Sequence, residues 1–256
     1  MITIKNKAAI QKMAIAGKYI AEILNNVHAY LRPGTSTLDL DIWLGAQLKE
    51  KGLVSRAQGY RGYKNVSCIS INDEVVHGVP KKEKVIREGD LVKIDICASW
   101  KGYCADMARC YFIGNASEEA QSLVKIAQAA LDKGIEKAVP GNRLTDISAA
   151  IQAEVERHGY GIVRDFAGHG IGKNMHEEPE IPNFGEFGQG PILRSGMTFA
   201  IEPMITQGAF HVYVAQDGWT VKTVDKGLAA HIEDTIVVTD HGPRILTRFQ
   251  PQQGIS

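Results

Sequence analysis

Two carboxylates interrupt an apolar segment near the middle of the chain, "KIDICASWKGYCAD". Residues 91–99 alternate as a strand would, with apolar side chains on one face and Asp95 on the other. A turn near Lys101 and Gly102 returns the chain and places Asp106 nearly diagonal to Asp95 on the same face. Because neighbouring carboxylates repel and are costly to bury, the pair predicts a cation between them.

The second half of the chain carries similar acids. Residues 198–205 are expected to form a strand that carries Glu202, and the strand in "AAHIEDTIVVT" carries Glu233. Between the helical part of this half and Glu202 lies "AGHGIGKNMHEEP", in which His169 is expected in a glycine-rich loop and His176 follows. Each half therefore offers two carboxylates, and the second half adds imidazoles.

Four carboxylates and one imidazole around one point suit two divalent cations of harder character, such as manganese, iron or cobalt. Two such ions hold a hydroxide and polarise a carbonyl, which is hydrolytic chemistry. Any one of these acids taken singly is explained by a buried ion pair, and a single histidine by an ordinary core or surface position. That explanation fails for the set, because only Lys93 and Arg109 lie near in the same strands.

Four helices are expected to position these strands. Apolar spacing and turn residues predict helices over about 10–31, 38–51, 117–138 and 145–158. Residues of matching type recur at an offset of 107 in both halves, including Pro33 and Pro140, Gly52 and Gly159, and Asp95 and Glu202. Chance is the alternative, since such turn residues are common. We expect one catalytic domain, 1–256, with pseudo-repeat halves at about 10–113 and 117–240, packed face to face.

Composition limits the class of protein. The chain has 256 residues, 44% of them apolar, and its 29 basic and 29 acidic side chains cancel. It can bury a full core, and its charge predicts neither nucleic-acid binding nor an anionic membrane surface. We find no apolar run of membrane-spanning length and no signal peptide, so a cytoplasmic protein is expected. The cysteines form no Cys-x-x-Cys pair, which argues against disulfides and a structural zinc site.

The motifs "KIDICASWKGYCAD", "GHGIGKNMHEEP", "FAIEPM" and "HIEDT", in this order and spacing, resemble the type I methionine aminopeptidases of bacteria. The resemblance covers nearly the whole chain. It implies an α+β "pita-bread" fold, with two pseudosymmetric helix-helix-sheet halves around a dinuclear metal site. It also implies removal of the initiator methionine from nascent proteins when the second residue is small, with two divalent cations (Mn, Fe, Co or Zn) per chain.

The resemblance assigns roles to individual residues. The metal ligands would be Asp95, Asp106, His169, Glu202 and Glu233. Asp106 and Glu233 would bridge the ions, Asp95 would hold one, and His169 with Glu202 would hold the other. Glu202 would also carry the proton from the attacking water to the leaving amine. His77 and His176 would contact the substrate and stabilise the tetrahedral intermediate. The pocket for the methionine side chain would be lined by Tyr60, Tyr63, Cys68, Met175 and Trp219.

Three positions depart from the family pattern. Met107 replaces a usual threonine, His231 a glutamine and Asp234 a histidine. We expect these changes to alter metal preference or rate. The alternatives are an Xaa-Pro aminopeptidase, prolidase or creatinase relative, a type II methionine aminopeptidase, and a non-enzymatic binding protein of the same fold. The expected partners are nascent polypeptide N-termini; a monomer is expected, and contact with the ribosome is left open.

Overall fold

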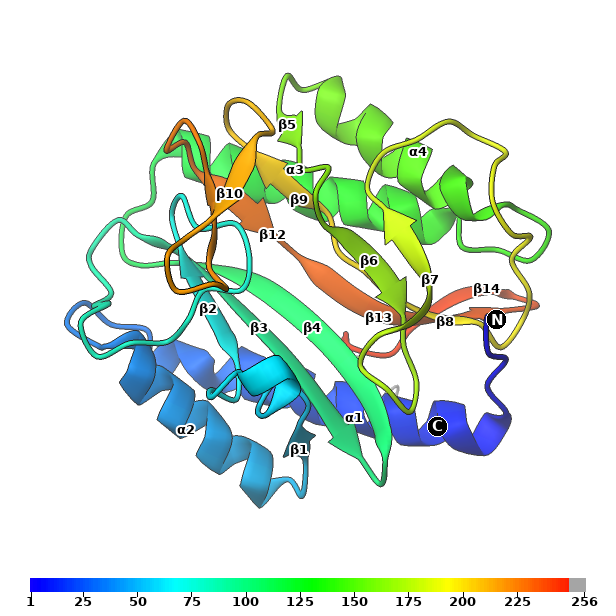
Figure 1. Ribbon diagram of the computed structural model, residues 1–256, viewed down its shortest axis with the longest axis horizontal. Coiled ribbons are helices and arrows are strands. Elements are labelled where there is room, and N and C mark those ends of the chain that lie inside the picture. The colour runs from blue at the N-terminus through cyan, green and yellow to red at the C-terminus, as the bar shows by residue number, and fades with distance from the viewer. Residues whose placement is uncertain (249–256) are drawn as a thin grey trace, which may run out of the picture.

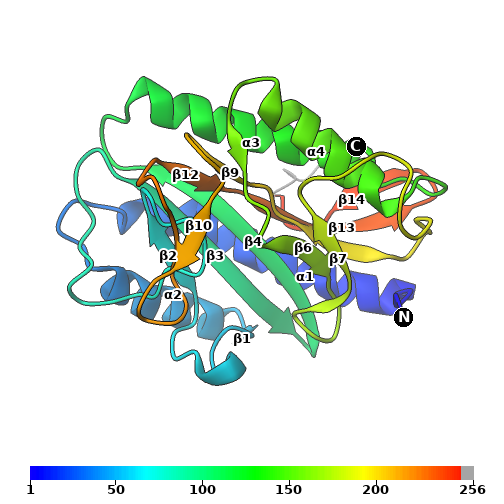
Figure 2. The same cartoon turned by 45° about the horizontal axis from the view of Figure 1, so that its top comes forward.

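The computed structural model describes residues 1–248. Two pairs of helices cover the same face of a curved sheet, each pair over a different part of it (Figures 1 and 2). The first pair is α1 (Lys7–Asn26) with α2 (Thr37–Glu50), and the second is α3 (Glu118–Glu136) with α4 (Leu144–Glu156). The four predicted helices are thus confirmed to within a few residues at each end. Short 3-10 turns, η1 (Val27–Ala29) and η2 (Tyr60–Gly62), complete the helical part.

Three of the four long helices begin at residues of a typical capping type. The side chain of Asn6 accepts a hydrogen bond from Ala9 N at 2.9 Å at the start of α1, and Ser36 and Ser117 cap α2 and α3 in the same way. The buried face of α1 packs on the sheet through Leu24, in a cluster that includes Ile94. The second helix pair forms its own cluster over the other part of the sheet. Each helix pair therefore holds one part of the sheet.

Within residues 1–248 the main sheet has nine strands, and all of its strand pairs are antiparallel. Its central order is β1-β3-β4-β13-β8-β6-β7, with β2 paired to β3 and β14 paired to β13. The bounds are β1 (Val54–Ser55), β2 (Cys68–Ile71), β3 (Leu91–Trp100), β4 (Tyr103–Phe112), β6 (Ala167–Gly170), β7 (Glu177–Pro182), β8 (Thr198–Ile201), β13 (Glu233–Thr239) and β14 (Gly242–Ile245). Two small sheets flank it: β12-β9-β5 and β10-β11. These strands are β5 (Gly161–Ile162), β9 (Met204–Thr206), β10 (Val212–Val214), β11 (Val221–Thr223) and β12 (Ala229–His231).

The hairpin β3–β4 has the predicted register. Asp95 pairs with Ala108, and Cys97 pairs with Asp106, so the two acids are diagonal neighbours on one face. The turn between the strands falls at Lys101 and Gly102 as expected. The first pair of carboxylates therefore comes from adjacent strands of one sheet.

Two predicted strands of the second half are each broken in the structure. Residues 198–205 do not form one strand: β8 ends at Ile201, Glu202 lies in the connection, and β9 joins the separate sheet. Pro203 has no N–H to donate to a ladder, and the pairing of β8 with β13 ends before it, at Ile201. The other prediction fails at Ile232, which separates β12 from β13. Both acids therefore lie at a point where the chain passes from one sheet to another.

His169 lies on strand β6, so its prediction as a loop residue was wrong. The glycines around it allow close packing of strands. A Cβ at Gly168 would lie 2.5 Å from the carbonyl oxygen of Ala200, and one at Gly170 would lie 2.1 Å from that of Glu178. Glycine runs are common in turns, which is why the sequence indicated a loop.

The turns that the repeat relates have matching backbone conformations. Gly34 and Gly141 have φ of 94° and 93°, and Gly89 and Gly196 have φ of 85° and 89°. Both pairs lie at the offset noted above, which is what two related halves require; the division into pseudo-repeat halves remains a prediction. None of the helices within residues 1–248 has the length and apolar character that a membrane span requires.

Candidate active site

All the residues that the sequence assigned to the site line one cavity of about 880 Å³. The predicted metal-binding side chains come from different strands: Asp95 from β3, Asp106 from β4, His169 from β6 and Glu233 from the first residue of β13. Glu202 enters from the connection after β8. Because β4, β13, β8 and β6 are consecutive neighbours in the sheet, residues distant in sequence meet here.

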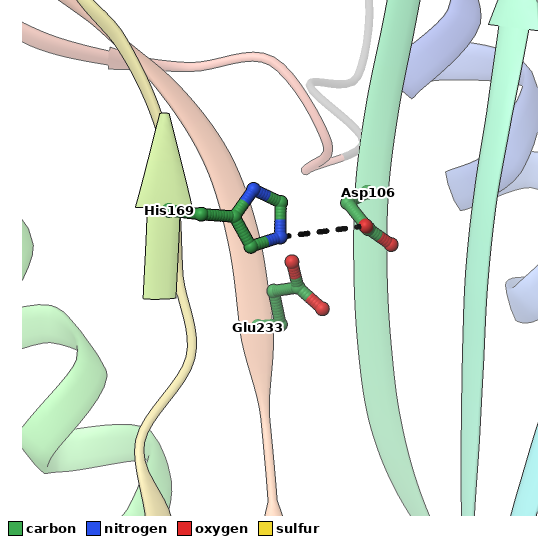
Figure 3. Close-up of side chains that lie close together, drawn as sticks. All are labelled: Asp106, His169 and Glu233. Atoms are coloured by element: carbon green, nitrogen blue, oxygen red, sulfur yellow. Dashed lines mark ion pairs between the residues drawn. The ribbon is translucent and has the colours of Figure 1, made fainter. Parts of the chain in front are cut away.

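Four of these side chains bring their polar atoms close together. His169 Nε2 lies 3.9 Å from Asp106 Oδ2, the contact drawn in Figure 3, and 3.6 Å from Glu202 Oε1. Donor atoms of Asp106, His169 and Glu233 all lie within 4.8 Å of one another. Figure 3 shows these three side chains converging on a common point. The three are buried, with 8%, 5% and 2% of His169, Asp106 and Glu233 exposed.

The ring of His169 is held with one nitrogen toward the carboxylates. Its Nδ1 lies 2.9 Å from the carbonyl oxygen of Gly170, a contact in which Nδ1–H donates. This leaves the Nε2 lone pair facing Asp106 and Glu202, as metal-ligating histidines are held. Burial, followed by the nearby His176, lowers the pKa of His169 to about 3. The imidazole is therefore neutral at pH 7, and its contacts with the acids are not pairs of full charges.

The carboxyl groups of the site repel one another. Burial raises the pKa of Asp106 to about 7, with a further contribution from the charge of Glu202. Burial also raises the pKa of Glu202 to about 8. For Glu233 and Asp95, burial and then the neighbouring Asp106 raise the pKa well above its ordinary value. The site therefore favours protons or cations among its oxygens.

No lysine or arginine within residues 1–248 forms an ion pair with these acids. The two basic side chains that the sequence placed nearby have other partners. Lys93 Nζ donates to the carbonyl oxygen of Asn72 at 2.8 Å, and Arg109 Nη2 pairs with Asp234 Oδ1 at 2.6 Å. One further observation fits a bound ion: Glu233 Oε1 is buried and has no hydrogen-bond partner among the described residues. The residues present thus fit divalent cations with oxygen and imidazole donors.

Asp95 is placed differently from the other four. It lines the same cavity, but it belongs to neither group of converging donor atoms, which are Asp106–His169–Glu233 and Glu202–His231–Glu233. Cys68, on the neighbouring strand β2, pairs with Asp95 and also lines the cavity. Asp95 thus lies between the carboxylate cluster and the predicted methionine pocket.

Aromatic side chains form one wall of the cavity. The rings of Tyr63 and Trp219 meet edge to face, with centroids 5.0 Å apart. His176 Nδ1 lies 3.3 Å from the hydroxyl of Tyr60. Met175 completes this wall. Apolar and aromatic groups with few polar atoms suit a thioether side chain.

His77 adopts a strained backbone conformation, with φ of 56°. Its ring lies edge-on to Phe166, with centroids 5.5 Å apart. Burial, followed by the charges of His231 and His176, lowers the pKa of His77 to about 4. Burial, followed by Arg61, lowers that of His176 also. Both imidazoles are neutral at pH 7 and each retains one N–H to donate.

Sequence reasoning missed two residues of this region. Phe166 lines the cavity and packs on His77, yet an isolated phenylalanine carries no signal for that role. His231 was identified only as a departure from the family, although its Nε2 lies 3.4 Å from Glu202 Oε2. The alternation of "HIE" did place His231 and Glu233 on one face, which was the available signal.

Comparison with known proteins agrees with this geometry. Residues 11–240 match metallopeptidase family M24. A methionine aminopeptidase of Clostridium acetobutylicum is 49% identical over 247 residues, 96% of this chain and 99% of that protein. The crystal structure of a methionine aminopeptidase from Thermotoga maritima superposes with a TM-score of 0.95 at 43% identity, over 97% of this chain and 100% of that one. A prolidase from Pyrococcus furiosus has a TM-score of 0.79 at 24% identity, over 97% of this chain and 66% of that one, which shows the fold alone.

The α+β fold is thus the pita-bread fold of metal-dependent exopeptidases, and the buried carboxylate-imidazole cluster fits a bound metal. The chain belongs to metallopeptidase family M24, and within it to the methionine aminopeptidases. The predicted family, fold class and enzyme class are therefore confirmed, including the use of divalent metal that the family name implies.

Proposed function

We propose that this enzyme removes N-terminal methionine from nascent proteins and peptides whose second residue is small, using two divalent cations. The observation that carries the proposal is the cavity itself: all predicted metal-binding, catalytic and methionine-pocket residues line it together. The aromatic residues Tyr63 and Trp219 lie in the same cavity as a carboxylate cluster that favours cations. This arrangement supports a site that takes the methionine side chain and the scissile carbonyl together.

The proposed metal ligands are Asp95, Asp106, His169, Glu202 and Glu233. Asp106 and Glu233 would be shared between the ions; Glu233 belongs to both groups of converging donor atoms, and Asp106 to one of them. When bound, the ions polarise the scissile carbonyl and lower the pKa of a water molecule. Manganese, iron, cobalt and zinc are all compatible with oxygen and imidazole donors.

The chain's own groups handle the protons and the developing charge. Glu202 is proposed to accept the proton of the attacking water and to deliver it to the leaving amine, since its carboxylate lies against His169 at the cluster. His77 and His176 are proposed to donate their N–H groups to the substrate and to the oxyanion that forms from its carbonyl. Neutral imidazoles suit this role, because they donate without drawing the carboxylates into ion pairs.

Substrate choice tests the proposal. Metal-stripped enzyme is reloaded with Mn²⁺, Fe²⁺, Co²⁺ or Zn²⁺ and assayed on a Met-X-Ala-Ser peptide panel, beside peptides with proline in the second position. We expect release of methionine when X is Gly, Ala or Ser, and little release when X is a large residue. Preferential cleavage before proline would instead support an Xaa-Pro aminopeptidase. No cleavage with any metal, together with tight binding of intact peptides, would support a non-enzymatic binding protein.

Asp106→Asn is the matched variant. It keeps the shape of the side chain and removes a charge from the cluster, so we expect hydrolysis to be lost while the far-UV circular dichroism is unchanged. Glu136→Gln, which affects only the exposed Lys133–Glu136 pair, serves as the control. Unchanged turnover in Asp106→Asn would contradict the assignment of this residue. The proposed location is the cytoplasm and the proposed partners are nascent chain N-termini, with the enzyme acting as a monomer.

A further inference from the structure

His231 lies with its side chain beside the proposed metal ligands Glu202 and Glu233, and the family pattern gives it no role. It is the last residue of β12 and is 2% exposed. Its Nε2 lies 3.4 Å from Glu202 Oε2 and 4.0 Å from Glu233 Oε2. Within residues 1–248 this nitrogen is buried and has no hydrogen-bond partner.

We propose that His231 is a further metal ligand, which gives an imidazole donor to the ion held by Glu202 and Glu233, as His169 does for the ion held by Asp106 and Glu233. This inference rests on the metal site proposed above. His231 stands at a position where the family pattern has glutamine. The proposal therefore predicts a metal site with more nitrogen donors than the family pattern gives.

The environment of His231 favours ligation over a simple hydrogen bond. Its Nε2 is a buried atom without a hydrogen-bond partner and lies 4.0 Å from Glu233 Oε2, and the other oxygen of that carboxylate, Oε1, is also buried without a partner. Unsatisfied buried polar atoms are rare in native proteins and call for an explanation such as an ion. Donor atoms of Glu202, His231 and Glu233 all lie within 4.8 Å of one another, the same limit that the Asp106 group meets. A cation bound by this group would give His231 Nε2 the partner that it lacks.

A second imidazole has a consequence for metal choice. Carboxylate oxygens suit manganese and magnesium, whereas imidazole suits zinc, iron and nickel. With His231 as a ligand, each of the two groups of converging donor atoms contains one imidazole. The enzyme should therefore hold zinc or iron more tightly, relative to manganese, than a version that lacks His231.

Metal-binding measurements on metal-stripped protein test this inference without recourse to activity. His231→Gln is titrated with Zn²⁺ and with Mn²⁺ by equilibrium dialysis, and the visible ligand-field spectrum of the Co²⁺-loaded protein is recorded. We expect Kd for one Zn²⁺ to rise by about 10- to 100-fold or more, since changes to residues that only hydrogen-bond to a metal ligand already have an effect of that size. We expect a smaller rise for Mn²⁺ and a changed Co²⁺ spectrum. The control is His28→Gln, because His28 is exposed and packs on Tyr111 outside the cavity.

The outcomes separate this inference from the proposed function. Equal losses of Zn²⁺ and Mn²⁺ affinity with an unchanged Co²⁺ spectrum would mean that His231 only positions Glu202, and would overturn ligation. Unchanged affinities and spectrum would overturn it too, while methionine removal stands. A wild-type protein that binds no metal and cleaves no peptide would overturn the proposed function itself. His231→Asn, checked by circular dichroism, replaces His231→Gln if the latter does not fold.

Discussion

Asp234 follows the proposed metal ligand Glu233 and contacts Thr247 and Arg248 near the end of the described residues. Its replacement should destabilise the whole enzyme. The side chain has no exposed area, and both of its oxygens are used. Arg109 Nη2 contacts Oδ1 at 2.6 Å, and Arg248 Nε contacts Oδ2 at 2.6 Å. Thr247 Oγ1 also donates to Oδ1, at 2.8 Å. In Asp234→Asn the shape is kept, but the charge is lost and an amide N–H₂ group faces a guanidinium.

The expected loss follows from burial. Removing one partner of a buried ion pair costs about 3–5 kcal/mol, because the other charge is left uncompensated. Here the guanidinium side chains are 20% exposed for Arg109 and 34% exposed for Arg248, so water offsets part of that loss. We expect about 3 kcal/mol of the free energy of unfolding. At about 2–4 °C per kcal/mol for a domain near this size, Tm should fall by about 6–12 °C.

Thermal unfolding of metal-stripped protein at pH 7, followed by circular dichroism, measures this loss without a contribution from metal binding. Glu136→Gln is the control, because it breaks only the exposed Lys133–Glu136 pair, worth about 0–1 kcal/mol. Arg109 Nη1 also donates to the carbonyl oxygen of Glu233 at 2.6 Å, so Asp234→Asn should retain less metal on dialysis. A Tm equal to that of Glu136→Gln would refute this reasoning.

Three further changes have defined outcomes. Burial raises the pKa of Asp217, but hydrogen bonds from Lys81, Thr220 and Trp219 outweigh burial, so the pKa lies below its ordinary value. A lowered folded-state pKa contributes stability that is present above about pH 4 and is lost as the pH falls toward the folded-state pKa. Asp217→Asn should therefore reduce the fall in Tm between pH 6 and pH 3. Gly168→Ala should lower the metal content measured after dialysis, because its Cβ would lie 2.5 Å from the carbonyl oxygen of Ala200 and displace the strand that carries His169. Gly45→Ala, whose Cβ would meet Val66 at an ordinary 3.5 Å, should leave the metal content unchanged. Trp219→Ala should raise KM for methionyl peptides more than it lowers kcat, because the ring packs on Tyr63 in the predicted side-chain pocket, and an unchanged KM would count against that pocket.

Local periodicity was enough to predict the helices and the β3–β4 hairpin. The alternation around Asp95 and the turn at Lys101 and Gly102 fix which face each side chain takes, so the diagonal placement of Asp106 followed from the sequence. Such features depend on residues that are neighbours along the chain, and the structure has them within a few residues of the expected positions.

Features that depend on contacts between distant segments were less predictable. The break after Ile201 and the one at Ile232 arise where the chain leaves the main sheet for the β12-β9-β5 sheet. No apolar pattern marks such a change of sheet, because both sides remain buried. For the same reason His169 was expected in a loop: its glycines reflect strands packed on Ala200 and Glu178, which only the fold brings close.

The most direct test of the central claim is metal content measured together with turnover. Metal-stripped enzyme is titrated with Co²⁺ or Mn²⁺, the ions bound per chain are counted, and the cleavage of Met-Ala-Ser is recorded in the same samples. We predict negligible cleavage in stripped protein, a rise in cleavage that follows ion binding, and loss of both in Asp106→Asn. Full cleavage by stripped protein in the presence of a chelator would contradict the claim that these buried carboxylates act by holding metal.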